Sequence, residues 1–321
     1  MSAGEFKSAT APLPLIMGPT GAGKTDLALR LAERHPIEIV SVDSALVYRG
    51  MDIGTGKPSR EQLERVPHHL VDILDPAQAY SAGQFVRDAT QAIADIRARG
   101  RLPVLVGGTM LYFRALRRGL AEMPTADPQV RQEIDAEAAR VGWPALHAQL
   151  TLLDPVTAQR IQPNDGQRIQ RALEVHRLTG RTLSELHAQT RPADPSLSFA
   201  AFAWAPSDRE RLYAAIERRF ESMMQAGLLD EVRRLQQRGD LHADLPAIRS
   251  VGYRQLWEHL CGRDSLASSV QRAIFATRQL ARRQLIWLRA ENDVQWYNAL
   301  DSAAADQIEQ AIATFCSKLS V

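Results

Sequence analysis

Hydrophobic and polar positions along the chain predict strands that alternate with helices. Four apolar runs have the length and composition of buried strands: LPLIM at 13–17, IEIVSV at 37–42, PVLVGG at 103–108 and FAAFAWAP at 199–206. The first run leads into KTDLALRLAERH, in which Leu27 and Leu31 share a helical face and Pro36 ends the helix. This alternation predicts an α/β fold with a parallel, doubly wound sheet flanked by helices.

Between residues 123 and 196 the strand pattern disappears. The segment reads as helices with breaks at Gly142, Pro144, Pro155 and Gly180. Because the last strand-like run follows it, we expect an all-helical insertion at 123–196 within one core domain built from 1–122 and 197–321. After residue 208 the chain is expected to be mostly helical again.

Composition narrows the class of protein. The chain has 321 residues, of which 45% are hydrophobic and 24% charged, as in ordinary globular proteins. No run approaches the roughly 20 apolar residues that span a bilayer, so we expect a cytoplasmic protein without membrane contact. We also expect this protein to be a monomer. Cys261 and Cys316 lie far apart in sequence and are predicted to be free thiols. A net charge of only +2 predicts no polyanion partner, but residues 271–290 hold five arginines and no acid.

The clearest chemical motif is GPTGAGKT, which fits G-x-x-x-x-G-K-[ST] and lies between a predicted strand and a predicted helix. Its glycines let successive N–H groups turn inward, and the helix N-terminus adds its dipole. Lys24 adds a full charge, and the Thr25 hydroxyl can bind Mg²⁺. The predicted phosphate-binding residues are Gly18, Pro19, Thr20, Gly21, Ala22, Gly23, Lys24 and Thr25. The motif does not identify the phosphate compound, because any organic diphosphate presents a similar charge pattern.

Further polar residues are predicted at the carboxyl ends of the strands, where ligands of parallel sheets bind. This edge brings Lys24, Thr25, Asp43, Ser44 and Thr109 onto one rim. Asp43 could serve as a ligand of Mg²⁺ or its water, as a general base, or as a helix cap. Thr109 could cap the helix that follows it.

Seven segments occur in an order that resembles a known family. They are GPTGAGKT, VSVDSALVYRGMDIGTGKP, PHHLVDILDP, YSAGQF, PVLVGGTMLY, QRIQRALEV and RSVGYRQLW. Together they cover roughly 15–289 and resemble the successive signatures of bacterial tRNA dimethylallyltransferases. The resemblance implies transfer of a dimethylallyl group from dimethylallyl diphosphate to the N6 amine of the adenosine just 3′ of a tRNA anticodon, with Mg²⁺ required and pyrophosphate released. It also implies a P-loop kinase-like core whose helical insertion closes over the anticodon arm.

This activity suggests roles for the rim residues. The exocyclic amine of adenine is a poor nucleophile, so a base that takes its proton would help, and Asp43 is the candidate. Backbone N–H groups, Lys24 and Mg²⁺ on Thr25 would stabilise the charge that gathers on the leaving pyrophosphate. By resemblance, Thr109 contacts either the target nucleotide or the diphosphate, and both alternatives stay open.

A tRNA substrate also requires a binding surface, because extruding the target base costs a few kcal/mol. Asn164 or Asp165 can cap a helix that presents polar side chains of the QRIQR signature, with Ile169 turned the other way. RSVGYR at 249–254 could combine phosphate contacts with base stacking. The resemblance adds Arg131, at a position where the family contacts tRNA. Together with the rim after the strands, these segments give the predicted tRNA contacts Asp43, Ser44, Ala45, Leu46, Thr109, Arg131, Gln167, Arg168, Ile169, Gln170, Arg171, Arg249, Gly252, Tyr253 and Arg254.

A third basic surface is predicted on the helix at 271–290. At 100° per residue, Gln271 falls in one stripe about 40° wide with three arginines that complete the predicted tRNA contacts: Arg278, Arg282 and Arg289. Ala273, Ala276, Leu280 and Trp287 lie opposite and are expected to face the core. A cationic stripe without neutralising acids suits a phosphate backbone.

Other functions share parts of these signals. A small-molecule kinase would explain the phosphate loop but leaves the arginines of QRIQR and 271–290 without a purpose. An adenylate isopentenyltransferase, which acts on free nucleotide, shares the N-terminal signatures but needs no long basic C-terminal half. A non-catalytic RNA-binding protein would not require a complete phosphate loop.

Overall fold

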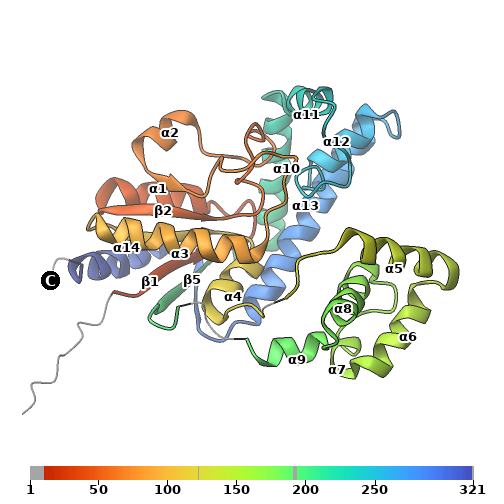
Figure 1. Cartoon of the computed structure of the whole chain (residues 1–321). Coiled ribbons are helices and arrows are strands. Elements are labelled where there is room, and N and C mark those ends of the chain that lie inside the picture. Colours follow the sequence, from red (N-terminus) through yellow and green to blue (C-terminus); the bar gives the residue numbers. More distant parts are fainter. Residues whose placement is uncertain (1–10, 122, 191–193, 320–321) are drawn as a thin grey trace, which may run out of the picture. The chain divides into compact units, whose positions relative to one another are not determined.

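The computed structural model describes residues 11–121, 123–190 and 194–319, and its chain divides into two compact units (Figure 1). The first unit combines residues 1–117 with 194–321, and the second comprises 118–193. The first holds a parallel sheet with its helices, whereas the described part of the second is helical. The second unit thus begins and ends a few residues before the insertion proposed at 123–196.

A parallel sheet of six strands forms the centre of the first unit. Its order is β3-β2-β4-β1-β5-β6, and every neighbouring pair is parallel. The strands are β1 (Leu13–Met17), β2 (Ile37–Val42), β3 (His68–His69), β4 (Leu102–Gly107), β5 (Phe199–Ala205) and β6 (Val294–Asn298). The four predicted strands and the α/β class are confirmed. β3 and β6 were not predicted. β3 has only two residues, and β6 is a half-exposed edge strand without a continuous apolar run.

Helices cover both faces of this sheet. On one face, α3 (Ala82–Ala98) and α4 (Met110–Arg118) pack Phe85 and Phe113 against Leu15. On the other face, α1 (Lys24–Arg34) and α14 (Ser302–Ser317) pack Leu31 and Ile308 into one cluster. Burial on both faces explains why the inner strands read as nearly continuous apolar runs.

A second group of helices lies beside the carboxyl end of the sheet (Figure 1). It consists of α10 (Arg209–Gln225), α11 (Leu228–Gln237), α12 (Tyr253–Leu260) and α13 (Leu266–Arg289). Their shared core includes Phe220, Val232 and Trp257, and it also takes in Tyr48 and Met51 from the segment after β2. This segment, which continues to the short helix α2 (Arg60–Arg65), is therefore supported by the helices.

The second unit has a core of its own. Its helices are α5 (Pro128–Val141), α6 (Trp143–Leu153), α7 (Pro155–Ala158), α8 (Gly166–Thr179) and α9 (Leu183–Ala188). Ile134, Leu146 and Leu173 belong to one buried cluster. Three predicted breaks are confirmed, since Gly142 and Gly180 follow the ends of α5 and α8 and Pro155 opens α7.

Two expectations from composition can be compared with the structure. Cys261 and Cys316 are free thiols, as predicted. In the part of the chain that is described, no helix has both the length and the apolar character needed to cross a bilayer.

Candidate active site

The phosphate loop has the geometry that its glycines predict. Gly21 and Gly23 have φ of 81° and 80°, values that side chains disfavour, and α1 begins directly afterwards at Lys24. A Cβ on Gly18 would lie 2.1 Å from the Trp204 carbonyl oxygen, so this position cannot carry a side chain where β1 passes β5. Lys24 Nζ donates to the Pro19 carbonyl at 2.8 Å, which folds the ammonium back over the loop.

A pocket of about 460 Å³ opens at this loop. Its wall combines the phosphate loop with Asp43 after β2, Gly108 after β4, a segment before α2, and residues of the distant helices α10 and α13, among them Arg219 and Gln284. The remaining lining includes Thr20, Gly21, Gly23, Lys24, Thr25, Asp26, Thr55, Gly56, Lys57 and Pro58. Residues of α10 and α13, two helices far from the phosphate loop in sequence, thus complete a pocket whose other walls lie at the carboxyl ends of the strands.

Two neighbouring cations of the pocket wall, Lys24 and Arg219, favour the binding of an anion. Burial lowers the pKa of Lys24 to about 8, Asp43 partly opposes the shift, and the positive charge of Arg219 adds to it. Burial also lowers the pKa of Arg219, against the attraction of Asp43 and Asp26, although guanidinium stays a cation at neutral pH. A bound diphosphate would relieve the repulsion between these two cations.

Asp43 keeps one carboxylate oxygen available. Its Oδ1 accepts the Ala45 N–H at 2.8 Å, and no hydrogen bond to Oδ2 is recorded among the described residues. The side chain stabilises the turn that follows β2 rather than a helix, since residues 44–47 are in turns. This arrangement argues against the helix-cap interpretation and leaves Oδ2 free for a proton or a cation.

Thr109 occupies the rim position next to Gly108. Its hydroxyl accepts the Ser44 N–H at 3.1 Å, and its own N–H donates to the Val42 carbonyl at 3.1 Å. Its carbonyl accepts the Tyr112 N–H at 2.9 Å, as expected at the start of α4. Thr109 therefore connects the ends of β2 and β4 and brings Ser44 to the rim beside Asp43.

Gln284 connects α13 to the phosphate loop. Its Oε1 accepts the Thr20 N–H at 2.9 Å, and its Nε2 donates to the Gly108 carbonyl at 2.8 Å. The Thr20 amide of the phosphate loop is thus engaged by a side chain of α13. A Cβ on Gly108 would lie 2.4 Å from Nε2, so the glycine permits this contact.

Comparisons with known proteins agree with this architecture. Residues 46–291 match the IPP transferase family model, and residues 11–73 match that of isopentenyl transferases. The tRNA dimethylallyltransferase of Bordetella petrii is 54% identical over 308 residues, which cover 95% of this chain and 98% of that protein. The chain belongs to the tRNA dimethylallyltransferase family. Its Burkholderia thailandensis relative of the same name is 59% identical over 86% of each chain.

Solved structures of the family share the fold. The full-length tRNA isopentenylpyrophosphate transferase of Bacillus halodurans is 36% identical with a TM-score of 0.69, and the match covers 97% of this chain and 98% of that one. A eukaryotic dimethylallyltransferase, studied while acting on tRNA, is 25% identical with a TM-score of 0.78 over 95% of this chain and 79% of that one.

Two pocket residues of this dimethylallyltransferase family member were missed in the sequence. Arg219 follows Ile216 by three positions and precedes Phe220, so it occupies the apolar face of α10. On α13, Gln284 follows the buried Ala281 by three positions and precedes the buried Leu288 by four, so it also lies on an apolar side of its helix. A polar residue on the apolar side of a predicted helix is the sequence signal that could have identified both as pocket residues.

In the second unit, two of the predicted RNA-contacting residues bind a buried glutamate. Arg131 and Arg171 both donate to Glu174, which is 0% exposed. Burial acts to raise the pKa of Glu174, but the hydrogen bonds from the two arginines outweigh it and hold the pKa below its usual range. The predicted capping of α8 is confirmed for Asp165, which accepts the Arg168 N–H.

The remaining residues of QRIQR differ in what they can contact. Gln167 and Arg168 are exposed, and Gln170 donates to Asp135 at 2.6 Å. Ile169 is 0% exposed, so its predicted tRNA contact is wrong for the side chain, which packs in the core of the unit.

The expectation that Tyr253 stacks on a base is wrong. Its ring is 0% exposed, and its hydroxyl donates to Glu231 at 2.5 Å. Gly252 beside it is buried as well, whereas Arg249 and Arg254 are exposed. The aromatic ring of RSVGYR therefore belongs to the core, because α12 starts at Tyr253 and turns it inward.

The arginine stripe of α13 is confirmed in part. Arg282 and Arg289 are exposed, and no ion pair of either is recorded among the described residues. Arg278 pairs with Glu217 of α10 at 2.6 Å, so the expectation of a stripe without neutralising acids is wrong at this position.

The predicted core face of α13 is also partly wrong. Ala273 is buried as expected, but Trp287 is 39% exposed, and the residues that accompany Ala273 in the core are Ile274, Ala281 and Leu288. The helix is rotated relative to the expectation because α10, α12 and the sheet together decide which side is covered.

Proposed function

We propose that this member of the tRNA dimethylallyltransferase family transfers a dimethylallyl group from dimethylallyl diphosphate to the N6 amine of the adenosine 3′-adjacent to a tRNA anticodon, with release of pyrophosphate. One observation carries the proposal. A single pocket combines a phosphate loop, a second cation in Arg219, and a carboxylate in Asp43 with a free oxygen.

The chemistry assigns these groups different tasks. The N6 nitrogen attacks C1 of the dimethylallyl group while the C1–O bond breaks, and the electron pair of that bond leaves with the diphosphate. Asp43 Oδ2 accepts the proton released from N6 as the C–N bond forms. Backbone N–H groups of the phosphate loop, Lys24 and Arg219 stabilise the negative charge that gathers on the leaving group.

Magnesium fits this donor set. The Thr25 hydroxyl and the Asp43 and Asp26 carboxylates are oxygen donors on the pocket wall, and Mg²⁺ in enzymes is commonly held by one or two such groups together with substrate phosphates. When bound, the ion supplies further neutralisation of the leaving diphosphate. We therefore retain Thr25 as the proposed metal ligand.

The tRNA-binding proposal rests on the exposed basic residues of both units. Arg249, Arg282 and Arg289 of the core unit are exposed and available for phosphate contacts, whereas Arg168 of α8 is exposed but paired with Asp165. Arg131, Arg171 and Arg278 remain proposed tRNA contacts. Each is paired with a glutamate, so a tRNA phosphate would replace this carboxylate or share the arginine with it. We further propose that the helical unit closes over the anticodon arm and that the protein acts as a cytoplasmic monomer.

Label transfer tests the function directly. With ¹⁴C-labelled dimethylallyl diphosphate and Mg²⁺, unmodified tRNA should become labelled, AMP should not, and ATP should not be consumed in a parallel reaction. Label on AMP instead of tRNA would favour the free-nucleotide transferase, and ATP consumption with transfer of its γ-phosphate would favour a kinase.

Replacing Asp43 tests its role as the base. Asp43→Asn keeps the side-chain size but removes the proton acceptor, so the single-turnover rate should fall by roughly 10²- to 10⁴-fold. The affinity for an anticodon stem-loop should stay within about twofold, because other residues supply the phosphate contacts. Asp244→Asn, the same chemical change at an exposed aspartate outside the pocket lining, is the matched control. A single-turnover rate of the Asn variant near that of the wild type would remove Asp43 as the base.

A further inference from the structure

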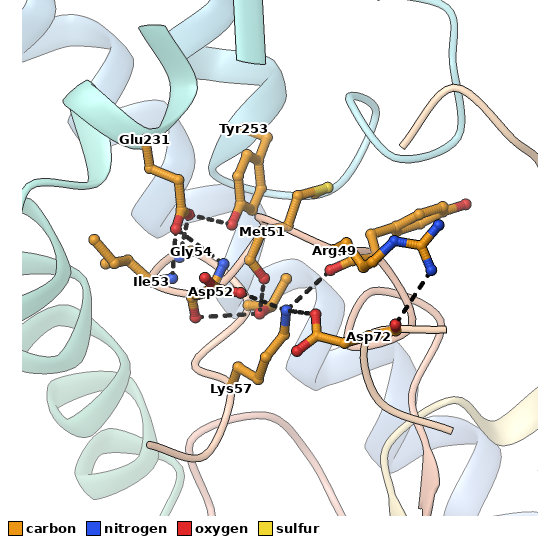
Figure 2. A network of polar contacts seen from close by, with 11 residues as sticks. Arg49, Met51, Asp52, Ile53, Gly54, Lys57, Asp72, Glu231 and Tyr253 are labelled. Atoms are coloured by element: carbon orange, nitrogen blue, oxygen red, sulfur yellow. Dashed lines mark hydrogen bonds and ion pairs between the residues drawn. The ribbon is translucent and has the colours of Figure 1, made fainter. Parts of the chain in front are cut away.

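A buried carboxylate holds the segment between Met51 and Lys57, one wall of the pocket. Glu231 of α11 is 3% exposed. Its Oε2 accepts the N–H groups of Asp52 and Ile53, both at 2.9 Å, and its Oε1 accepts the Gly54 N–H at 3.1 Å and the Tyr253 hydroxyl (Figure 2). Both oxygens therefore bind two donors each.

This arrangement is unusual for a buried charge. Glu231 occupies an apolar-face position of α11, between Leu228 and Leu235, and no ion pair to it is recorded among the described residues. A buried carboxylate without a cation is costly unless several hydrogen bonds replace its hydration. Three of its four donors are the backbone amides of residues 52–54. The carboxylate can accept all three only while this segment keeps its present backbone conformation.

The same segment reaches the diphosphate pocket. Thr55, Gly56 and Lys57 line the pocket, and Arg219 Nη2 donates to the Thr55 carbonyl at 3.4 Å. Gly56 has φ of 63°, and a Cβ there would lie 1.8 Å from Arg219 Nη2. The segment and the Arg219 guanidinium thus touch, and a shift of one displaces the other.

Lys57 has a structural part in this wall. Its ammonium donates to the Tyr48 carbonyl at 2.9 Å and to the carboxylates of Asp52 and Asp72, and its side chain is 3% exposed. Figure 2 shows these contacts on the side of the segment that faces away from Glu231. Because its charge is already neutralised by two carboxylates, Arg219 and Lys24 remain the cations available to a diphosphate.

We propose that Glu231 is a positioning residue for the diphosphate substrate: by holding the amides of residues 52–54, it sets Thr55 and Gly56 against Arg219. The inference rests on the proposed function, since it assigns Arg219 to the diphosphate of the prenyl donor. Glu231 itself touches no substrate. Its effect is therefore expected in KM for dimethylallyl diphosphate and not in RNA affinity.

Glu231→Gln tests this role. The variant keeps the side-chain size, but its amide nitrogen cannot accept hydrogen bonds, so it satisfies at most two of the four donors. KM for dimethylallyl diphosphate should rise roughly tenfold, as for one misplaced charge-assisted hydrogen bond, while Kd for the anticodon stem-loop stays within about twofold. Tyr253→Phe is the matched control, because it removes one donor and keeps the three backbone contacts, and its KM should change little.

The outcomes separate the inference from the proposed function. A folded Glu231→Gln variant with wild-type KM for dimethylallyl diphosphate would overturn the positioning role, even if its melting temperature is lower. If this variant does not fold, Gly54→Ala replaces it, because the added Cβ would lie 2.5 Å from the Tyr253 ring and displaces the same segment. An unchanged KM in Gly54→Ala would overturn the role equally. Failure of the wild-type protein to label any RNA would instead contradict the proposed function.

Discussion

At the scale of single residues, the site depends on polar side chains placed on apolar helix faces. Arg219 lies on the same side of α10 as the buried Leu212 and Ile216, although it is itself exposed, and Glu231 and Gln284 have equivalent positions on α11 and α13. Each is held by groups far away in sequence: Gln284, for example, binds the Thr20 amide across 264 positions. A buried polar group is costly without a partner. Gln284 binds Thr20 and the Gly108 carbonyl of the pocket wall, and Glu231 binds residues 52–54, directly before the wall residues Thr55 and Gly56.

Lys24 makes the reaction sensitive to pH. Its protonated form attracts the diphosphate, and its pKa in the free protein is about 8. As pH rises through this value the proton is lost, so kcat/KM for dimethylallyl diphosphate should fall above about pH 8, while kcat should fall only at higher pH because a bound diphosphate stabilises the ammonium. Initial rates at varied pH, with saturating tRNA, measure both quantities.

A Lys24→Arg variant is the control for this profile. The guanidinium stays charged throughout the range, so the alkaline fall should disappear even if overall activity is lower. A wild-type fall that begins only near pH 10, or one that persists in Lys24→Arg, would contradict the assignment.

At the scale of elements, α13 connects two parts of the proposed reaction. Its inner side places Gln284 on the phosphate loop, and its outer side presents Arg282 and Arg289. Because an α-helix is stiff over this length, a tRNA backbone on the outer side would bind the same rigid body that supports the diphosphate pocket. The neighbouring Arg278 is already paired with Glu217.

Salt dependence tests the outer side of α13. If Arg282 contacts a phosphate, Arg282→Ala should weaken stem-loop binding and reduce the slope of log K against log salt concentration by roughly 1. Arg272→Ala is the matched control, because Arg272 lies on the same helix but pairs with Glu258 and Asp264. Binding measured by fluorescence anisotropy at several salt concentrations gives the slope. Equal slopes for wild type and Arg282→Ala would show that the arginine faces something other than RNA.

At the scale of the whole molecule, the diphosphate and the RNA are expected to involve the two units differently. Each residue that lines the diphosphate pocket belongs to the core unit, whereas the QRIQR signature belongs to the helical unit. Each unit also has its own buried cluster. A ligand of the core unit can therefore stabilise that unit without ordering the other.

Hydrogen exchange tests this division. Pyrophosphate with Mg²⁺ should slow amide exchange at residues 18–25 and leave that of α8 unchanged, because its contacts lie in the core unit. An anticodon stem-loop should slow exchange in both units. Sulfate at the same ionic strength is the control for general salt effects. Protection of α8 by pyrophosphate alone would contradict independent responses of the units.

The sequence alone determined the features that depend on neighbouring residues. The phosphate loop, the four inner strands and the helix ends at Gly142 and Gly180 follow from local backbone preferences and apolar runs, and the order of the signatures pointed to the family. Only the tertiary structure decided which helix side is covered. It turned Tyr253 inward and Trp287 outward, and it joined Arg219, Gln284 and the Glu231-held segment to one pocket. Helical periodicity shows that a face exists, but the elements packed against it decide what that face contacts.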